Sequence, residues 1–393
     1  MDADILAAIP PEKRIIAWHG PHQSYEDLRR LFGRMASIPA AYYKIVPAAH
    51  TLEDGLVPLY LLRTCGRNDL ISYSSGQVGA WTRVLAPHLG CPFIYGTLAR
   101  ENRLGRGIMN ISQLLQHYDF SDLRPIDILY GIADATAINA QEPMLHNSGY
   151  RELHLPALFL PFPSRAHDMK WFQPFQESLR KLLGFDLRGL TLGRPFKEAV
   201  IQTVGPHRSS KAAWMAKGAN VMVRKTGRWY ADTADAECLI ETATAHGIPI
   251  LGKPAAVVGC GSAGRAAATA LVRQGARVTL INRGAKRGKW ASALLNMPYV
   301  PLKDFKAGEY DIVVNATPVG ESDNHLPFAI SDFHGTLIDY ASRPHGKTPL
   351  ITQALEGGLI AIDGNEVMAA SVNHQFRLMT GRVLPPSAYA CSA

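Results

Sequence analysis

One segment constrains the fold of this chain more than any other, the run AAVVGCGSAGRAAATALV at residues 255–272. Gly259, Gly261 and Gly264 form a G-x-G-x-x-G pattern between an apolar strand-like run and an Ala-rich helical stretch. In such a unit the first glycine permits a tight turn, the second lets the backbone approach a pyrophosphate, and the third lets helix and strand pack closely. The free N–H groups at the helix start attract phosphate. The segment predicts a dinucleotide-binding domain; the alternative is a glycine-rich turn that serves only packing.

The end of the next predicted strand, RVTLINR, indicates which dinucleotide is bound. NAD-binding proteins commonly place an Asp or Glu there for the ribose 2′-hydroxyl. Here the strand ends in Asn282 and Arg283, and Arg287 follows closely. Cations at this point suit a 2′-phosphate, so the sequence predicts NADP as the cofactor, the alternative being a solvated basic loop. Ser262 and Ala263, inside the glycine motif, complete this predicted cofactor site.

Composition indicates which kinds of partner and site to expect. The 41 Lys and Arg exceed the 33 Asp and Glu, giving a formal charge of +8, but no run of five basic residues occurs. This favours a small phosphorylated or carboxylated molecule over nucleic acid. The five cysteines form no C-x-x-C pair and no His/Cys cluster, so we expect neither a metal site nor a disulfide framework. Neither a signal peptide nor a membrane span is evident, and we expect a reducing, cytoplasmic setting.

The first region has the pattern of half a barrel. The runs RIIAW, AYYKIVP, DLISYSS and CPFIYGTL read as strands, and helical patterns separate them. Four βα units in this order predict parallel strands, and half of an eight-stranded barrel has open sheet edges. Two such halves could complete one another, so we expect a possible homodimer through this region.

Two further α/β regions follow, which makes three predicted domains. The first covers residues 1–125; the second covers 126–240 and is completed by a C-terminal helix over 365–393; the third, the dinucleotide-binding domain, covers 241–364. The strands predicted in the last two are DILYGIAD, ALFLPF, GLTLG, AAVVG, ARVTLINR, YDIVVNATP, GTLIDYA and LIAIDG. The fold class is therefore α/β throughout, with a Rossmann domain last.

Several motifs, in order, resemble shikimate dehydrogenase. NRGAKR is similar to that family's NADP-phosphate loop, NATPVG at 315–320 to its loop beside the nicotinamide, and RPFKEAV to the segment that carries its catalytic lysine. PMLHNSGYRELHL, RPHGKTPLITQALEGG and the helix that starts at Gly364 also fit, so the likeness covers about Ile126 to Leu384. The resemblance implies an NADP-dependent oxidoreductase, with Thr317 and Gly364 on the nicotinamide side of the site.

The same resemblance implies the catalytic residues. Lys197 matches the family's catalytic lysine and Asp235 its catalytic aspartate. Such a pair can exchange a proton with a hydroxyl while hydride moves to or from a nicotinamide. Asn220 matches a substrate-contacting asparagine, and Thr191 stands where the family's N-V-T begins, which makes both substrate-binding candidates.

Other positions depart from the family pattern. The S-x-S-P motif, whose serines hold the substrate carboxylate, reads Ala140-Gln141-Glu142-Pro143. Ala donates no hydrogen bond, and a Glu facing a carboxylate repels it. The family's pocket tyrosine and C-terminal glutamine align with Ser342 and Ser371. Either the substrate differs from shikimate or turnover has been lost, and the sequence leaves the true substrate open.

The first region resembles type I 3-dehydroquinate dehydratase, which precedes the dehydrogenase in bifunctional proteins and in the fungal arom polypeptide. RIIAWHG, YYKIV and VGAWTRVL are the matching segments. They align His19 with that family's proton shuttle, Lys44 with its Schiff-base lysine and Arg83 with its carboxylate-binding arginine. The family's catalytic glutamate has no counterpart, and its S/P-G-Q loop reads Leu104-Gly105-Arg106. We therefore expect a vestigial site without dehydratase activity.

Two functions from different classes follow. The first is an NADP-dependent oxidoreductase that acts on shikimate, 3-dehydroshikimate or a related polyhydroxylated ring. The second is a non-catalytic sensor or transcriptional repressor with a protein partner, since fungal quinate repressors resemble the same enzymes with eroded sites. Retention of Lys197 and Asp235 favours the enzyme, and loss of the carboxylate serines favours the sensor. A fragment of a longer protein is a third reading, and the oligomeric state stays open.

Overall fold

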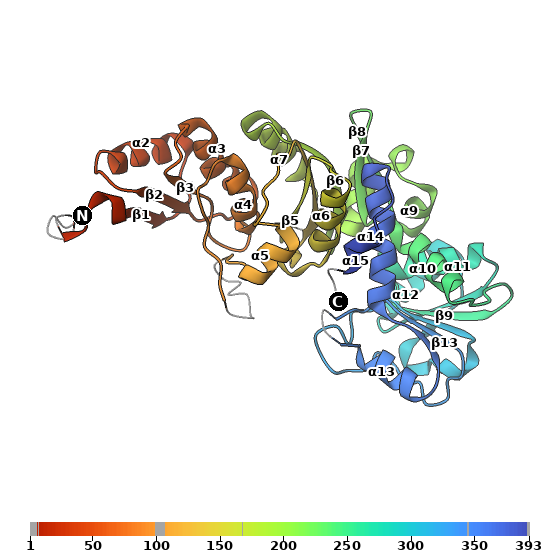
Figure 1. Ribbon diagram of the computed structural model, residues 1–393. Helices are drawn as coiled ribbons and strands as arrows, with labels where there is room; N and C mark the ends of the chain where they lie inside the picture. Colours follow the sequence, from red (N-terminus) through yellow and green to blue (C-terminus); the bar gives the residue numbers. More distant parts are fainter. Residues whose placement is uncertain (1–5, 7, 99–106, 167, 344–345, 391–393) are drawn as a thin grey trace. The chain divides into compact units, whose positions relative to one another are not determined.

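The computed structural model describes residues 6, 8–98, 107–166, 168–343 and 346–390. The chain forms two compact units: Met1–Pro195 with Pro385–Ala393, and Phe196–Leu384. Figure 1 labels their helices and strands. In the described part of the chain, no helix is long and apolar enough to cross a membrane.

The first unit begins with a parallel sheet in the order β1-β2-β3. Its strands are β1 (Ile15–Gly20), β2 (Tyr42–Pro47) and β3 (Leu70–Ser72), and its helices are α2 (Tyr25–Ala36), α3 (Leu56–Cys65), α4 (Ala80–Leu85) and α5 (Ile111–Tyr118). The Ser24 Oγ accepts a hydrogen bond from the Asp27 N–H at 3.2 Å and so caps α2. Three of the four predicted strands are confirmed.

The fourth predicted strand, CPFIYGTL, is wrong. Residues 91–96 form no strand, and Thr97 makes only an isolated bridge to Asn110. Pro92 has no N–H to give to a sheet. The Phe93 ring packs edge-on against Tyr42 of β2, with ring centroids 4.9 Å apart, so the segment covers the sheet with side chains instead of extending it.

A second parallel sheet segment completes the first unit. Strand β4 (Ile128–Asp134) pairs with β5 (Ala157–Pro163) on one side and β6 (Asp186–Leu192) on the other. Every residue of β5 is buried. Helices α6 (Glu142–Glu152) and α7 (Phe172–Ser178) belong here, and the short helix α15 (Ser387–Ala390) packs against α6, where the Ser387 hydroxyl hydrogen-bonds to Glu152. The three strands predicted here are confirmed.

The second unit contains a feature that sequence reasoning missed, an antiparallel hairpin. Strands β7 (Val221–Lys225) and β8 (Arg228–Asp232) pair across a two-residue turn. Thr226 and Gly227 both have positive φ, 47° and 80°, as the favoured two-residue hairpin turns require. The signal was Thr-Gly between the apolar runs VMV and WYA. Helices α8 (Phe196–Val204) and α9 (Lys211–Ala216) precede the hairpin.

A six-stranded parallel sheet in the order β11-β10-β9-β12-β13-β14 forms the core of the second unit. Its strands are β9 (Pro254–Val258), β10 (Arg277–Asn282), β11 (Tyr299–Pro301), β12 (Ile312–Asn315), β13 (Thr336–Asp339) and β14 (Ile360–Ile362), and its helices are α10 (Ala234–Ala245), α11 (Ser262–Arg273), α12 (Ala285–Leu295), α13 (Pro349–Glu356) and α14 (Gly364–Thr380). The predicted strands are confirmed, and β11 was not foreseen.

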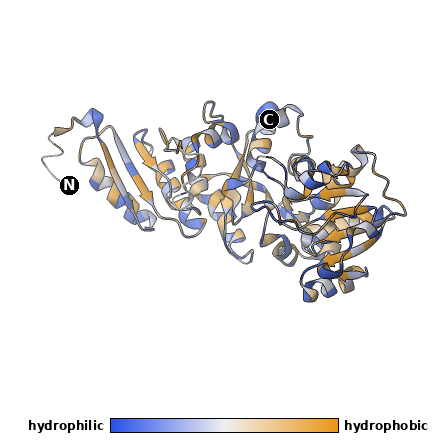
Figure 2. Ribbon diagram, turned by 90° about the horizontal axis from the view of Figure 1, so that it is seen from below, coloured by the Kyte–Doolittle hydropathy of each residue, from blue (hydrophilic) through white to orange (hydrophobic). Residues whose placement is uncertain are grey.

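Both faces of this sheet are buried, as parallel sheets require. Ala255 and Val257 of β9 belong to one apolar cluster, with residues of α10 and α11. Ala256 and Val258 belong to another, with residues of α13. Figure 2 shows strands of this sheet as orange, apolar ribbons. The sheet is doubly wound around β9, where the strand order reverses, and the carboxyl ends of strands at such a point are the usual ligand site.

Candidate functional site

The glycine loop, residues 259–264, follows β9. Gly259 has a φ of +105°, and its N–H donates to the Ile281 carbonyl at 2.8 Å. A Cβ on Gly264 would lie 1.8 Å from the Gly259 carbonyl oxygen, so the third glycine is needed for close packing. A Cβ on Gly261 would meet no atom within 4 Å. The backbone at Gly261 therefore faces open space at the start of α11, which suits a pyrophosphate group.

The start of α11 is also packed against the loop between α9 and β7. A Cβ on Gly218 would lie 2.4 Å from the Cβ of Ser262, the first residue of α11. The next residue, Ala219, donates its N–H to the Lys197 carbonyl at 2.7 Å. The backbone near Lys197 is thus tied closely to the glycine loop.

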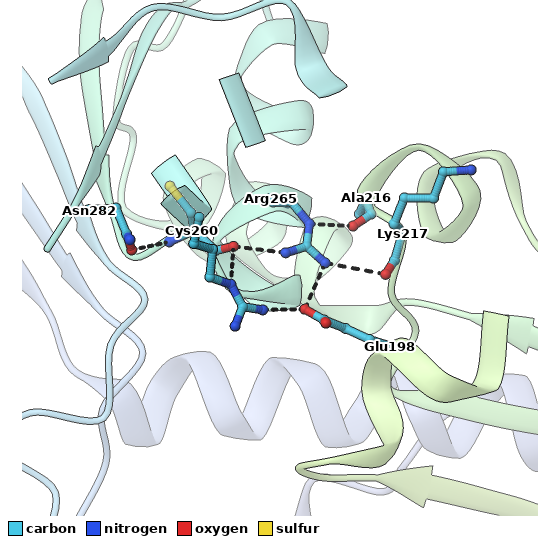
Figure 3. A network of polar contacts seen from close by, with 7 residues as sticks. Glu198, Ala216, Lys217, Cys260, Arg265 and Asn282 are labelled. Atoms are coloured by element: carbon cyan, nitrogen blue, oxygen red, sulfur yellow. Dashed lines mark hydrogen bonds and ion pairs between the residues drawn. The ribbon is translucent and has the colours of Figure 1, made fainter. Parts of the chain in front are cut away.

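A buried arginine joins these segments, and Figure 3 shows its contacts. The Arg265 side chain is 0% exposed. Its Nε donates to the Ala216 carbonyl at 2.6 Å, its Nη1 to the Cys260 carbonyl at 2.8 Å and its Nη2 to Glu198 Oε1 at 3.0 Å. The Trp290 ring covers the guanidinium, with 4.7 Å from Cζ to the ring centroid. Glu198 is the carboxylate that balances this buried charge.

Two of the residues predicted to bind the 2′-phosphate hold the glycine loop. Asn282 Oδ1 accepts from the Cys260 N–H at 3.1 Å, and its Nδ2 donates to the Gly284 carbonyl at 2.8 Å. Arg287 donates from Nε to the Cys260 carbonyl at 3.2 Å and from Nη2 to Glu198. Arg283 lies exposed between them in sequence. Sequence reasoning missed Glu198 and Arg265, although each stands beside a residue that a motif identified.

The predicted catalytic residues lie together. Lys197 Nζ is 3.1 Å from Asp235 Oδ2, and Asn220 Nδ2 donates to Asp235 Oδ1 at 2.8 Å. The amide is fixed because its Oδ1 accepts from the Ala234 N–H at 2.7 Å, and the Tyr340 hydroxyl donates to the Asp235 carbonyl at 2.7 Å. Each carboxylate oxygen of Asp235 therefore accepts one hydrogen bond, Oδ2 from Lys197 and Oδ1 from Asn220. These two contacts fix the carboxylate beside the lysine side chain.

The N-A-T-P loop leaves the carboxyl end of β12. Asn315 Oδ1 accepts from the Thr317 N–H at 3.1 Å and from its hydroxyl at 2.7 Å. Asn315 Nδ2 donates to Asp339 Oδ1 at 2.8 Å, and the Thr348 hydroxyl donates to Asp339 Oδ2 at 2.7 Å. Burial raises the pKa of Asp339 to about 6 against the lowering effect of these hydrogen bonds.

Three other sequence-derived positions lie around α14. A Cβ on Gly364 would lie 2.0 Å from the Ala341 carbonyl oxygen, so the helix starts in contact with the segment after β13. Ser342 follows directly. The Ser371 hydroxyl accepts from Gln375 Nε2 at 3.1 Å, inside the helix.

The positions aligned with the family's carboxylate serines are in the first unit. Ala140 stands just before α6, and Glu142 is the first residue of that helix. Thr191 is buried near the end of β6. The cluster of Lys197, Asp235 and Asn220 lies entirely in the second unit, and so does the glycine loop.

The three dehydratase-like residues interact electrostatically in the first unit. Ala17 of β1 pairs with Lys44 of β2, which puts His19 and Lys44 on one face of the sheet as diagonal neighbours. Burial, and next the Arg83 charge, lower the pKa of Lys44. Burial, then Lys44 and Arg83, lower the pKa of His19. The Lys44 Nζ lies 3.8 Å from the centroid of the Tyr95 ring.

Arg83 has the environment of an anion-binding group. It is 5% exposed, its guanidinium stacks 4.4 Å above the Tyr73 ring, and its Nε has no hydrogen-bond partner among the described residues. The hydroxyls of Ser72 and Ser74 are likewise buried and unpartnered there. Buried donors normally have partners, so the Arg83 Nε suits an oxygen-rich anion. The predicted loop Leu104–Arg106 lies outside the described residues.

Comparison with known proteins identifies the family. A family model described as type I 3-dehydroquinase matches residues 3–125, and one described as an FAD binding domain matches residues 255–318. The second match spans the glycine loop and its flanking strands, a motif that FAD and NAD(P) sites share. A shikimate dehydrogenase (NADP(+)) of Thermus thermophilus is 34% identical over 203 residues, which are 51% of this chain and 75% of that protein. The chain belongs to the shikimate dehydrogenase family.

Two further relatives are similar to larger parts of the chain. A shikimate 5-dehydrogenase from Thermus thermophilus, solved in complex with NADP(H) and shikimate, is 26% identical with a TM-score of 0.59; the match covers 67% of this chain and 98% of that one. The chloroplastic bifunctional 3-dehydroquinate dehydratase/shikimate dehydrogenase of Arabidopsis thaliana is 23% identical over 390 residues, 93% of this chain and 62% of that protein. Both resemblances found in the sequence are confirmed.

Proposed function

We propose that this chain is an NADP-dependent oxidoreductase that interconverts a hydroxyl and a carbonyl on a polyhydroxylated ring related to shikimate. The observation that carries the proposal is the Lys197–Asp235–Asn220 cluster, built in the same compact unit as the dinucleotide-type glycine loop. Solved relatives of the family bind NADP(H), and the open space before Gly261 fits the pyrophosphate. When bound, the nicotinamide supplies hydride chemistry.

Different residues of this chain would bind the cofactor and transfer the proton. The glycine loop and α11 would hold the pyrophosphate, Arg283 and Arg287 the 2′-phosphate, and the loop at Thr317 the nicotinamide side. Lys197 would give or take the proton of the reacting hydroxyl, because its Nζ is held by Asp235 Oδ2. Asn220 would fix the carboxylate orientation through its 2.8 Å hydrogen bond.

The substrate differs from shikimate at its carboxylate. Ala140 and Glu142 stand where the family carries two carboxylate-binding serines, and Glu142 would repel an anionic group. We therefore expect weak or absent shikimate oxidation, and better turnover of a ring without a carboxylate at that position. Turnover of shikimate at rates typical of the family would contradict this.

The test is a binding titration with NADPH and NADH, followed by a substrate panel monitored at the nicotinamide absorbance. NADPH should bind more tightly, and Arg283→Ala should erode the preference by about tenfold or more, because one charge-assisted contact contributes roughly 1.5–3 kcal/mol. Equal affinity of the wild type for both nucleotides would refute the assignment to NADP.

A second function, ligand binding without turnover, is favoured by the buried Arg83 side chain. Its Nε, which has no hydrogen-bond partner within the described part of the chain, suits a carboxylate, as a sensor with a protein partner would need. Dehydratase chemistry should be absent. Borohydride treatment with 3-dehydroquinate should leave Lys44 unmodified, and a trapped imine at Lys44 would show that the dehydratase step survives.

We also propose a homodimer through the first sheet, a cytoplasmic setting and the three domains predicted from sequence. Four free thiols, Cys65, Cys91, Cys238 and Cys260, support a reducing compartment.

A further inference from the structure

We infer that Glu198 is a specificity-determining residue that competes with the cofactor's 2′-phosphate for Arg287 and so limits the preference for NADP over NAD. This rests on the proposed function and deepens it. In the structure one carboxylate oxygen, Glu198 Oε1, accepts hydrogen bonds from two guanidinium groups, those of Arg265 and Arg287. Figure 3 shows Glu198 with Arg265. No motif assigned Glu198 a role.

The two arginines differ in how easily each can lose its ion pair with Glu198. Arg265 is 0% exposed and cannot lose its counter-charge to water, since an unpaired buried charge is costly. Arg287 is 50% exposed, so water can solvate it if it leaves Glu198. When a phosphate arrives, Glu198 stays with Arg265 and Arg287 changes partner.

The glycine loop tolerates this exchange. The Cys260 carbonyl accepts from Arg265 Nη1 at 2.8 Å as well as from Arg287 Nε at 3.2 Å. Its N–H remains bonded to Asn282 at 3.1 Å. Cys260 therefore keeps a partner on both backbone groups after Arg287 moves, and the exchange needs no rearrangement of the loop.

The competition follows from charge and geometry. Nε and Nη2 of Arg287 form the side-on fork that matches a phosphate or carboxylate, and both are occupied by Cys260 and Glu198. A 2′-phosphate must displace Glu198 from this fork before it can pair with Arg287. NADH carries no phosphate at that position, so its binding leaves the pair intact.

The experiment compares Glu198→Gln with the wild type. Glutamine keeps an oxygen acceptor for Arg265 but removes the charge, so NADPH should bind about two- to fivefold more tightly while NADH affinity stays nearly constant. Adenosine 2′,5′-bisphosphate against adenosine 5′-monophosphate should show the same difference without the nicotinamide. Glu237→Gln is the matched control, because Glu237 is paired with Arg273, 3.4 Å away on the surface.

Arg287→Gln should cancel the effect, so that adding Glu198→Gln to it leaves NADPH affinity unchanged. If Glu198→Gln does not fold, as thermal unfolding would show, Glu198→Asp keeps a charge for Arg265 but is too short for both arginines. It should also tighten NADPH selectively. Unchanged or weaker NADPH binding, or an equal gain for NADH, overturns the inference. A wild type that binds neither nucleotide overturns the proposed function instead.

Discussion

Lys197 and Glu198 are consecutive residues, yet their side chains belong to two different clusters. Lys197 reaches Asp235, and Glu198 reaches Arg265 and Arg287. The sequence identified Lys197 through a motif. It could not identify Glu198, because its partner Arg265 is 67 residues away and nothing in the composition shows where a long side chain ends.

We predict that Lys197→Ala reduces oxidoreductase turnover by about 10²–10⁴-fold, the usual contribution of a positioned proton-transfer group. Its NADPH affinity should stay nearly unchanged, because Lys197 contacts Asp235 rather than the glycine loop. Steady-state kinetics and a nucleotide titration check this. Lys225→Ala, at an exposed lysine at the end of β7, is the control. Retained turnover in Lys197→Ala would remove the lysine from the reaction.

Asp339 predicts a pH dependence of stability. Burial raises its pKa to about 6 from an ordinary 3.8, so the folded chain binds this proton more tightly than the unfolded chain. Its contribution to stability is largest below pH 3.8 and is lost as the pH rises through about 6. Asp339→Asn should flatten that part of the profile. Urea unfolding at several pH values measures it, with exposed Asp304→Asn as the control; an unchanged slope would contradict the assignment.

At the scale of the element, long apolar runs predicted the strands well. The runs that became β9, β10 and β12 are rich in Val and Ile and are buried on both faces, which a sequence shows directly. The segment 91–98 has similar composition, but its aromatic rings pack on the sheet instead of joining it. Strand β11 has only three residues, too few for any period to show.

The glycine loop offers a matched pair of variants. Gly264→Ala puts a methyl group into the Gly259 carbonyl and should lower both the thermal stability and nucleotide affinity. Gly261→Ala meets no protein atom, so it should keep the unfolding temperature but weaken NADPH binding, because its methyl group enters the space for the pyrophosphate. Thermal unfolding with and without NADPH separates the two. Normal NADPH binding by Gly261→Ala would place the cofactor elsewhere.

At the scale of the whole molecule, β1 is an edge of the first sheet within the described residues. Unpaired strand edges invite pairing. We predict that the chain self-associates through β1 and that Ile15→Lys, at a side chain 41% exposed on that strand, weakens the association. Size-exclusion chromatography with light scattering measures this, and Leu355→Lys on α13 is the control. A monomeric wild type at high concentration would contradict the prediction.

The path of the chain has a consequence for its synthesis. The first unit contains residues 1–195 and also 385–393, so the second unit is inserted into it, and the chain crosses between them twice. On the ribosome, residues 196–384 emerge before the segment that supplies α15, which packs against α6. The part of α6 that α15 covers therefore stays uncovered until residues 196–384, the whole second unit, have been synthesised. A single proteolytic cut at one crossing would likewise leave the two units covalently joined through the other.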